Sequence, residues 1–300
     1  MTEIMDAKRI THNPPKTRSP FQSQARTKHV FDIAAGFVVL LVVTFAIAPI
    51  IWTLLTSFKT ESQIVSANVN YLPSSLSFDN YTTLWRRSGY PHLLKNSAIV
   101  TSLTVLLSLT IGILGGYGIS RYRFRGRSVL MIFFLVIRMF PFTLMLIPLF
   151  ILLRRVHLHD THIGLALTYT TFLLPLCIWM LKGFFDGIPP DLEEASRIDG
   201  STRVGALIRI VIPLARPGIA ATTVFAAIGA WNEYVWALLL TTSNGARTWP
   251  VGLQLMVGEF QMPWGTLSAS GIISIIPILI GFAFVQRALV QGLVTGGVKG

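Results

Sequence analysis

The sequence predicts an all-α membrane protein, a polytopic bundle of six transmembrane helices. Of its 300 residues, 52% are hydrophobic and only 13% are charged, whereas charged residues make up about 25% of a typical soluble domain. Apolar runs of about 20 residues, the length that crosses a bilayer, recur along the chain. Because backbone groups inside a bilayer must be hydrogen-bonded within their own segment, these runs are expected to be helices.

Six segments have this length and composition. The expected spans are about 31–57, 95–120, 128–153, 162–185, 217–241 and 268–290. Prolines inside the spans predict kinks, because proline removes one helix hydrogen bond. They are Pro141, Pro148, Pro175 and Pro277. Gly112, Gly116 and Ser120 recur every fourth residue in the second span, and this stripe of small residues predicts close helix packing.

The distribution of Lys and Arg indicates the orientation of the chain, because cytoplasmic segments carry an excess of both. With the N-terminus in the cytoplasm, 17 of the 25 Lys and Arg residues fall inside, seven outside, and Arg138 within a span. Both termini are therefore expected to be cytoplasmic, with segments 58–94 and 242–267 outside. This excess accounts for the net charge of +12 without a nucleic-acid partner.

The chain divides into four predicted parts. Residues 1–29 are basic, rich in proline and without hydrophobic periodicity, and they predict a disordered cytoplasmic tail. Residues 30–94 hold the first span and an extracytoplasmic loop. Residues 95–290 hold the other spans and the largest cytoplasmic loop. Residues 291–300 are expected to form a cytoplasmic C-terminal tail.

The large loop reads PPDLEEASRIDGSTRVGALIRIVIPLARPG over residues 189–218 and predicts two short helices. Asp191 is placed to cap the first helix, with Glu194 three residues later as in a capping box. Gly200 then breaks this helix, and Ser201 is placed to cap the second one. Prolines bound the pair on both sides.

Both predicted helices have an apolar side. The apolar residues are Leu192, Ala195 and Ile198 on the first helix and Val204, Leu207, Ile208 and Val211 on the second. Such a pair either lies on lipid headgroups or docks into a groove of another protein. Four acidic residues between positions 191 and 199 favour the protein groove, because an anionic inner leaflet repels them.

The same loop resembles the signature of the membrane subunits of binding-protein-dependent ABC importers. That signature is E-A-A, three residues, Gly, nine residues and then I-x-L-P. The corresponding residues here, at the same spacing, are Glu194-Ala195-Ser196, Gly200 and Ile210-Val211-Ile212-Pro213. Ser196 and Ile212 depart mildly from the pattern. The segments RMFP, IPLF, WNEY and GLVTGGVKG resemble the carbohydrate branch, the maltose-type second permease subunit, and the resemblance covers about residues 30–300.

The resemblance implies a type I importer permease fold and a permease subunit in the bacterial cytoplasmic (inner) membrane. The implied activity is inward movement of a sugar or related solute: an oligosaccharide, a polyol or a sugar phosphate. The implied partners are a second, non-identical permease subunit, an ATP-binding-cassette ATPase dimer, an extracytoplasmic solute-binding protein and membrane lipid. The chain contains no G-x-x-x-x-G-K-[ST] motif, so ATP hydrolysis is expected on another polypeptide, with no catalytic residue or cofactor here.

In such importers the two short helices dock into a cleft of the ATPase, whose closure on ATP rocks the helix bundle. By this resemblance loop 190–214 couples the chain to its ATPase, with Glu194 pairing with a basic group and Gly200 supplying the turn. The expected coupling residues are Glu193, Glu194, Ala195, Asp199, Gly200, Ile210 and Pro213.

Two charges lie deep inside predicted spans, away from the span ends: Arg138 in the third and Glu233 in the fifth. A charge at membrane depth usually faces a cavity or a partner. Together with Trp231 and Asn232 they are expected either to line the solute path or its gate, or to form a structural polar clamp. An Arg138–Glu233 ion pair is near the limit of reach, because the depths differ by about 9 Å at 1.5 Å per helical residue.

Aromatic and histidine residues near the outer surface leave further alternatives. Trp231, Tyr234 and Trp236 either stack on a sugar or belong to the interfacial aromatic belt. Loop 242–267 carries Trp249, Phe260 and Trp264, and it either contacts the solute-binding protein or packs as a lid on its own bundle. The cluster His157, His159 and His162 lacks a matching set of ligands elsewhere, so a solvated loop is preferred to a metal site.

Two other classes of protein are rivals to the importer subunit. A stand-alone secondary transporter would need membrane-embedded carboxylates for ion coupling and shows inverted repeats. Glu233 is the one acidic residue away from the ends of the predicted spans. An intramembrane enzyme would need a nucleophile with its base, or metal ligands, at membrane depth, and Cys177 with the outer histidines does not supply one.

Overall fold

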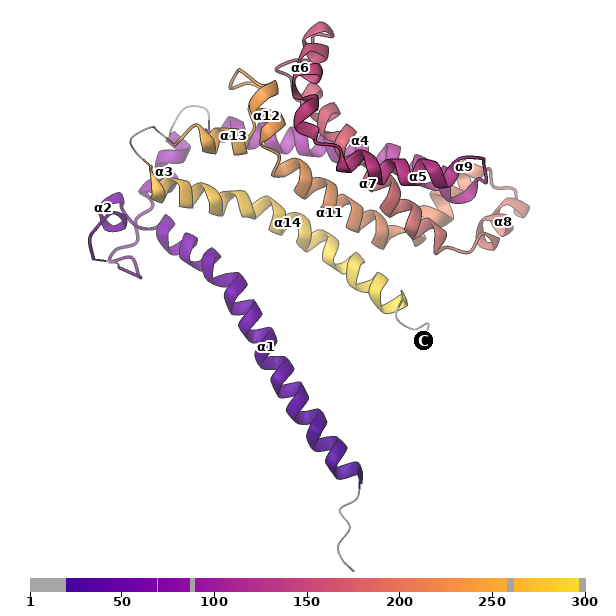
Figure 1. Cartoon of the computed structure of the whole chain (residues 1–300), viewed down its shortest axis with the longest axis horizontal. Helices are drawn as coiled ribbons and strands as arrows, with labels where there is room; N and C mark the ends of the chain where they lie inside the picture. The colour runs from indigo at the N-terminus through magenta and orange to yellow at the C-terminus, as the bar shows by residue number, and fades with distance from the viewer. Residues whose placement is uncertain (1–19, 69, 87–89, 258–261, 297–300) are drawn as a thin grey trace, which may run out of the picture. The chain divides into compact units, whose positions relative to one another are not determined.

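The computed structural model describes residues 20–68, 70–86, 90–257 and 262–296, with side chains between residues 31 and 286. Every regular element in these ranges is a helix (Figure 1). Four helices are long and apolar enough to cross a membrane, and two bent pairs raise the number of candidate spans to as many as six. The prediction of an all-α bundle of membrane helices is confirmed.

The chain separates into two units, residues 1–52 and residues 53–300. The described part of the first unit is helix α1, Pro20–Ser57, as far as Trp52. Its start corrects the prediction of a disordered tail over 1–29, because residues 20–29 are helical; residues 1–19 lie outside the described residues. Proline is favoured at the first position of a helix, and the Gln, Ala, Arg and Lys that follow favour helix.

The second unit is organised around α4, Tyr90–Arg121, and α7, His162–Asp186, which form its most extensive helix pair. The small-residue stripe lies at their contact, as predicted. A Cβ atom at Gly116 would lie 3.1 Å from the backbone nitrogen of Lys182 and 3.2 Å from the Cβ atom of Leu181. The two backbones therefore approach so closely that a methyl group at position 116 would be tighter than an ordinary contact with α7.

Helices α11, Arg216–Trp231, and α14, Trp264–Gly296, lie side by side, and α11 also packs on α4 and α7 (Figure 1). Helix α14 corrects the predicted C-terminal tail, because residues 291–296 continue the helix; residues 297–300 lie outside the described residues. Pro277 is inside α14 and does not end it.

The third predicted span, 128–153, is not one helix. Its two arms are bent by 86° at a break around Pro141. The residue before this proline, Phe140, is extended, with φ −69° and ψ 131°, because the proline ring excludes the helical region for its predecessor. The arms are α5 (Arg127–Val136) with η1 (Ile137–Met139), and η2 (Phe142–Met145) with α6 (Leu146–Arg155).

The fifth predicted span, 217–241, is also interrupted. Helix α11 ends at Trp231 after 16 residues, and a short helix α12, Val235–Leu240, follows the break. The break coincides with the sequence WNEY. At its other end α11 follows the segment Arg203–Leu214 with a bend of 78°.

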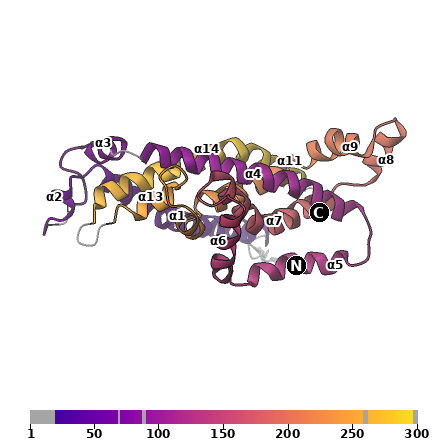
Figure 2. The ribbon, with the colours of Figure 1, turned by 90° about the horizontal axis from the view of Figure 1, so that it is seen from above.

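The shorter elements of the second unit gather at its two ends (Figure 2). One end holds α2 (Glu61–Ile64), α3 (Asp79–Arg86) and α13 (Trp249–Gln254). The other end holds α8 (Asp191–Ile198), α9 (Arg203–Ala206), a π-helical turn η3 (Leu207–Val211) and α10 (Ile212–Leu214). Helix α4 runs from one end to the other, so the α8–α10 segment and the α3 end lie at opposite ends of a candidate span.

The α4–α7 contact predicts a difference between two neighbouring glycines. Gly116→Ala should lower the free energy of unfolding by about 1–3 kcal/mol, the usual cost of overpacking, because the new methyl meets backbone of α7. Gly118→Ala is the matched control, since a Cβ atom there meets nothing within 4 Å. The measurement is the Tm of each purified variant, and equal Tm values for the two would contradict the close packing.

Candidate functional site

Helix α8 carries the acidic part of the predicted coupling loop. Its N-cap is Pro190, which corrects the prediction that Asp191 caps it. The carbonyl of Pro190 accepts hydrogen bonds from the backbone N–H groups of Glu193 and Glu194, at 2.9 and 3.1 Å. Asp191 is thereby the first helical residue. Three carboxylates lie in the first turn, where the partial positive charge of the helix N-terminus favours them.

Gly200 ends this helix in the way that its position predicted. Its φ angle is +89°, a left-handed conformation that side-chain-bearing residues rarely adopt. The N–H of Gly200 donates to the carbonyl of Arg197 (3.1 Å), and the N–H of Ser201 donates to the carbonyl of Ser196 (3.0 Å). These two bonds form a Schellman motif, which turns the chain sharply between α8 and α9.

The second short helix is capped by Thr202 rather than by Ser201, a further correction. The Thr202 hydroxyl accepts a hydrogen bond from the N–H of Gly205 at 3.0 Å. The helix begins at Arg203, so Thr202 and not Ser201 is the residue that directly precedes it. The cap is therefore displaced by one residue.

The predicted apolar stripe of the second helix is split between two faces. Leu207 and Val211 are buried, whereas Val204 and Ile208 are 63% and 58% exposed. A π-helical turn, Leu207–Val211, lies within this segment, and its wider spacing departs from the 3.6-residue period on which the predicted stripe rests. Pro213 follows this turn directly and has no N–H to continue an α-helical ladder.

The buried residues of this segment anchor it to the end of α7. Leu207 and Val211 pack with Leu181, Phe185 and Ile188 in one apolar cluster. The exposed residues face away from this cluster. On α8 the apolar side chains are likewise exposed, Leu192 by 44% and Ile198 by 85%.

The expected coupling residues differ in how far they are exposed. Glu194, Ala195, Asp199 and Gly200 are exposed, and Ile210 and Pro213 are half-buried. Glu193 is the exception, because it is buried and only 7% exposed. The segment thus presents one outward-facing acidic residue next to an inward-facing one.

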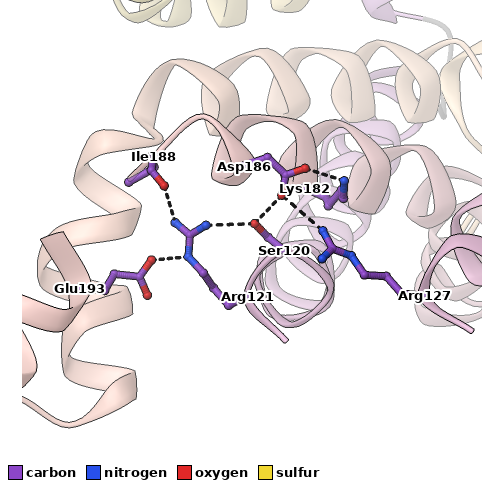
Figure 3. Close-up of polar contacts among 7 residues, drawn as sticks. All are labelled: Ser120, Arg121, Arg127, Lys182, Asp186, Ile188 and Glu193. Carbon is purple, nitrogen blue, oxygen red and sulfur yellow. Dashed lines mark hydrogen bonds and ion pairs between the residues drawn. The ribbon is translucent and has the colours of Figure 1, made fainter. Parts of the chain in front are cut away.

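Glu193 belongs to a polar network at the ends of α4 and α7 (Figure 3). Its carboxylate pairs with the Nε atom of Arg121 and accepts a hydrogen bond from the Tyr117 hydroxyl at 2.8 Å. Arg121 also donates to the carbonyl of Ile188 at 3.0 Å. No motif in the sequence pointed to Tyr117 or Arg121, since more than 70 residues separate them from their partner.

A second carboxylate, Asp186 at the end of α7, extends the network (Figure 3). It accepts a hydrogen bond from Ser120 at 2.7 Å and forms ion pairs with Lys182 and Arg127. Ser120 in turn accepts a hydrogen bond from Arg121 at 3.2 Å. The two carboxylates join the ends of α4 and α7 to the starts of α5 and α8.

The charges predicted at membrane depth line one cavity of about 540 Å³. Arg138 lies in η1, just before the bend, and Glu233 lies in the break after α11. The lining includes an aromatic group: Phe172 and Trp236 are stacked with ring centroids 4.8 Å apart, and Phe142 lies beside both.

Arg138 and Glu233 have separate contacts within this cavity. The Arg138 guanidinium lies over the ring of Phe225, 5.8 Å from its centroid. The Glu233 carboxylate accepts hydrogen bonds from the N–H groups of Trp236 (3.1 Å) and Ala237 (3.2 Å) in the first turn of α12. Among the described residues, the ion pairs do not include Arg138 with Glu233.

The other two residues predicted for the path do not line this cavity. Trp231 is 6% exposed, and its indole N–H donates to the carbonyl of Ser274 at 3.1 Å, which ties α11 to α14. Asn232 caps the end of α11 and donates to the carbonyl of Ile228. These contacts fit the structural alternative, although Trp231 also lines a second cavity, of about 200 Å³, with residues of α4, α11 and α14.

Loop 242–267 is partly packed on its own bundle. Trp249 is 1% exposed; its backbone N–H donates to the Ser97 hydroxyl at 2.8 Å, and its indole donates to Ser274. Trp264 is half exposed, and Phe260 lies outside the described residues. Trp249 therefore packs on its own bundle, as the second of the two alternatives for this loop expects.

The turn that contains the three histidines is held by Asp160. Its carboxylate accepts hydrogen bonds from the N–H groups of Thr242 (2.8 Å) and Ser243 (3.1 Å). Burial acts to raise the pKa of Asp160, but these donors outweigh it and lower the pKa below its usual value. Within the described ranges, His, Cys, Asp and Glu form no group of three that could hold a metal ion.

Within the described residues, apolar helices of membrane-spanning length, two bent pairs and an exposed two-helix segment at one end define a polytopic membrane protein. Residues 108–295 match the family described as binding-protein-dependent transport system inner membrane component. The chain belongs to this family, as its resemblance implied.

Curated relatives and a solved structure extend over most of the chain. It is 36% identical to the sulfoquinovosyl glycerol transport system permease protein SmoH of Agrobacterium fabrum, over 84% of this chain and 88% of the relative. It is 37% identical to the trehalose transport system permease protein SugB of Mycobacterium tuberculosis, over 87% and 95%. A crystal structure of a bacterial ABC transporter involved in alginate import matches with a TM-score of 0.75 and 25% identity, over 87% and 97%.

The Schellman turn predicts a sharp difference between two substitutions at Gly200. Gly200→Val should open the turn, because a left-handed conformation costs about 1–2 kcal/mol for an ordinary L-residue, whereas Gly200→Asn should preserve it, because asparagine tolerates this conformation. Hydrogen exchange of the Gly200 and Ser201 amides should accelerate in the valine variant alone. Equal protection in both variants would refute the role of the left-handed glycine.

Proposed function

We propose that this chain is one permease subunit of an ATP-binding-cassette importer that moves a carbohydrate or related solute inward across the cytoplasmic membrane. The family supports the transport role, and the names of SmoH and SugB, together with the alginate importer, support a carbohydrate. The same family membership favours this function over a stand-alone secondary transporter and over an intramembrane enzyme.

The observation that carries the coupling mechanism is the outward face of residues 190–214. Leu192, Ile198, Val204 and Ile208 are 44–85% exposed, although each is large and apolar. Exposed apolar side chains on short helices fit the groove of a partner protein. Glu194 lies on the same exposed helix, so the complementary groove would have an apolar floor and a basic rim. We propose that this groove lies on a cytoplasmic ATPase dimer.

The excess of Lys and Arg supports an orientation in which both termini and the α8–α10 segment are cytoplasmic. Closure of the ATPase dimer would then displace α8, and the displacement would rock the helices that α8 contacts. A second, non-identical permease subunit would complete the path across the membrane. A solute-binding protein would deliver the solute at the α3 end, and the family description is consistent with this.

The cavity around Arg138 and Glu233 is the proposed part of the solute path in this subunit. Sugars stack on aromatic rings and accept hydrogen bonds from charged groups, and Phe172, Trp236 and Arg138 supply these contacts on one wall. The proposal does not extend to Trp231 and Asn232, whose contacts hold helix ends.

Glu194→Lys tests the docking proposal. It should weaken association with the ATPase at least tenfold, about 1.4 kcal/mol, because the new cation would face the basic rim. The measurement is co-purification and titration of the ATPase with the permease pair in detergent. Asp79→Lys, an equal charge change at the opposite end of the unit (Figure 2), should leave ATPase association unchanged. Normal association of the Glu194→Lys variant would count against a docking role for α8.

Arg138→Ala tests the solute path. Uptake into proteoliposomes should fall by at least tenfold while assembly with the other subunits is retained, because the cavity loses its one cation among the lining residues. The solute is chosen beforehand by screening the binding protein against a panel of sugars. Arg138→Lys, which keeps the charge, should retain part of the uptake. Wild-type uptake by the alanine variant would assign Arg138 to packing.

A further inference from the structure

Adjacent acidic residues of α8 have opposite surroundings. Glu194 is exposed, whereas the Glu193 side chain is 9% exposed. Successive residues of an α-helix point about 100° apart, since 3.6 residues make one turn. Glu194 is therefore available to a partner, and Glu193 is committed to contacts within its own chain.

The partner of Glu193 has a fixed geometry. The Arg121 side chain is 13% exposed and donates to three acceptors on three segments: the Glu193 carboxylate on α8, the Ile188 carbonyl before α8, and the Ser120 hydroxyl on α4. The planar guanidinium holds such acceptors at set angles, which a lysine cannot do. Tyr117, one turn earlier on α4, fixes the second carboxylate oxygen.

This arrangement differs in kind from the apolar contacts around it. Leu207 and Val211 also hold the segment against α7, but apolar contacts are non-directional and permit sliding. A buried ion pair with directed hydrogen bonds does not slide without breaking, and breaking it leaves an uncompensated buried charge. A displacement of α8 that keeps this ion pair intact must therefore move the end of α4 as well.

We propose that Glu193 is a positioning residue: through Arg121 and Tyr117 it locks helix α8 to the end of transmembrane helix α4, so that movement of α8 becomes movement of the bundle. The proposal rests on the proposed function, in which the ATPase displaces α8. It departs from the expectation that Glu193 itself contacts the ATPase. Asp186, bonded to Ser120 and paired with Lys182 and Arg127, extends the same rigid connection to α7 and α5.

The test uses the full reconstituted complex and needs no knowledge of the solute. A cysteine introduced by Leu152→Cys, on the wall of the cavity, reports the state of the bundle through its labelling rate with a soluble maleimide; the native Cys177 is buried. Trapping the ATPase with ATP and vanadate should change this rate.

Glu193→Gln keeps the shape of the side chain and should reduce the trapping-induced change in labelling rate by roughly fivefold or more, with ATPase association unchanged. Asp191→Asn, which neutralises an exposed carboxylate on the same helix, should leave the change intact.

Each outcome decides the proposal. A wild-type labelling response in Glu193→Gln overturns it, and so does loss of ATPase association, which would make Glu193 a docking residue. If the Glu193→Gln permease pair itself does not form, so that ATPase association cannot be measured, Tyr117→Phe and Arg121→Lys repeat the test, and a full response in both overturns it. If trapping changes nothing in the wild-type background, the proposed coupling through residues 190–214 fails as well, which separates that failure from failure of the Glu193 lock alone.

Discussion

The close approach of α4 to α7 is the constraint on which the described part of the second unit depends. Lipid offers no hydrophobic drive for helices to associate, so van der Waals packing and polar contacts must hold them together. Gly112 and Gly116 let the two backbones meet. Once they meet, the end of α7 and the end of α4 lie together, and the α8–α10 segment makes its apolar cluster and its Glu193 ion pair against them.

Two kinds of attachment hold that segment, and they have different mechanical properties. Leu207 and Val211 pack in the apolar cluster around Leu181 and Phe185. These contacts stabilise the attachment of the segment but do not fix its orientation. The polar network of Arg121, Glu193 and Asp186 fixes the orientation of the segment, because its ion pairs and hydrogen bonds are directional. The segment keeps an outward apolar face that the described residues of the second unit leave uncovered, and this combination suits an element that must bind one partner and move another.

Two helices of predicted spans are interrupted, and both interruptions border the cavity that contains Arg138 and Glu233. Irregular backbone is tolerated there only where its polar groups are satisfied or line a cavity. The bend at Pro141 and the break at Asn232–Tyr234 both border the same cavity. The Glu233 carboxylate satisfies the free N–H groups at the start of α12, so a residue predicted from its charge alone as part of a path also has a structural task.

The sequence alone determined the class of fold, the apolar spans, the glycine turn at Gly200 and the small-residue contact, because each depends on local composition or on short, regular spacing. It did not determine the inward direction of Glu193, the split of Val204 and Ile208 from Leu207 and Val211, or the size of the bend at Pro141, which is 86° where the sequence predicted only a kink. Only the tertiary structure decided these features. The partners of Glu193 are more than 70 residues distant, and the register of the second short helix depends on a π-helical turn that its periodicity does not reveal.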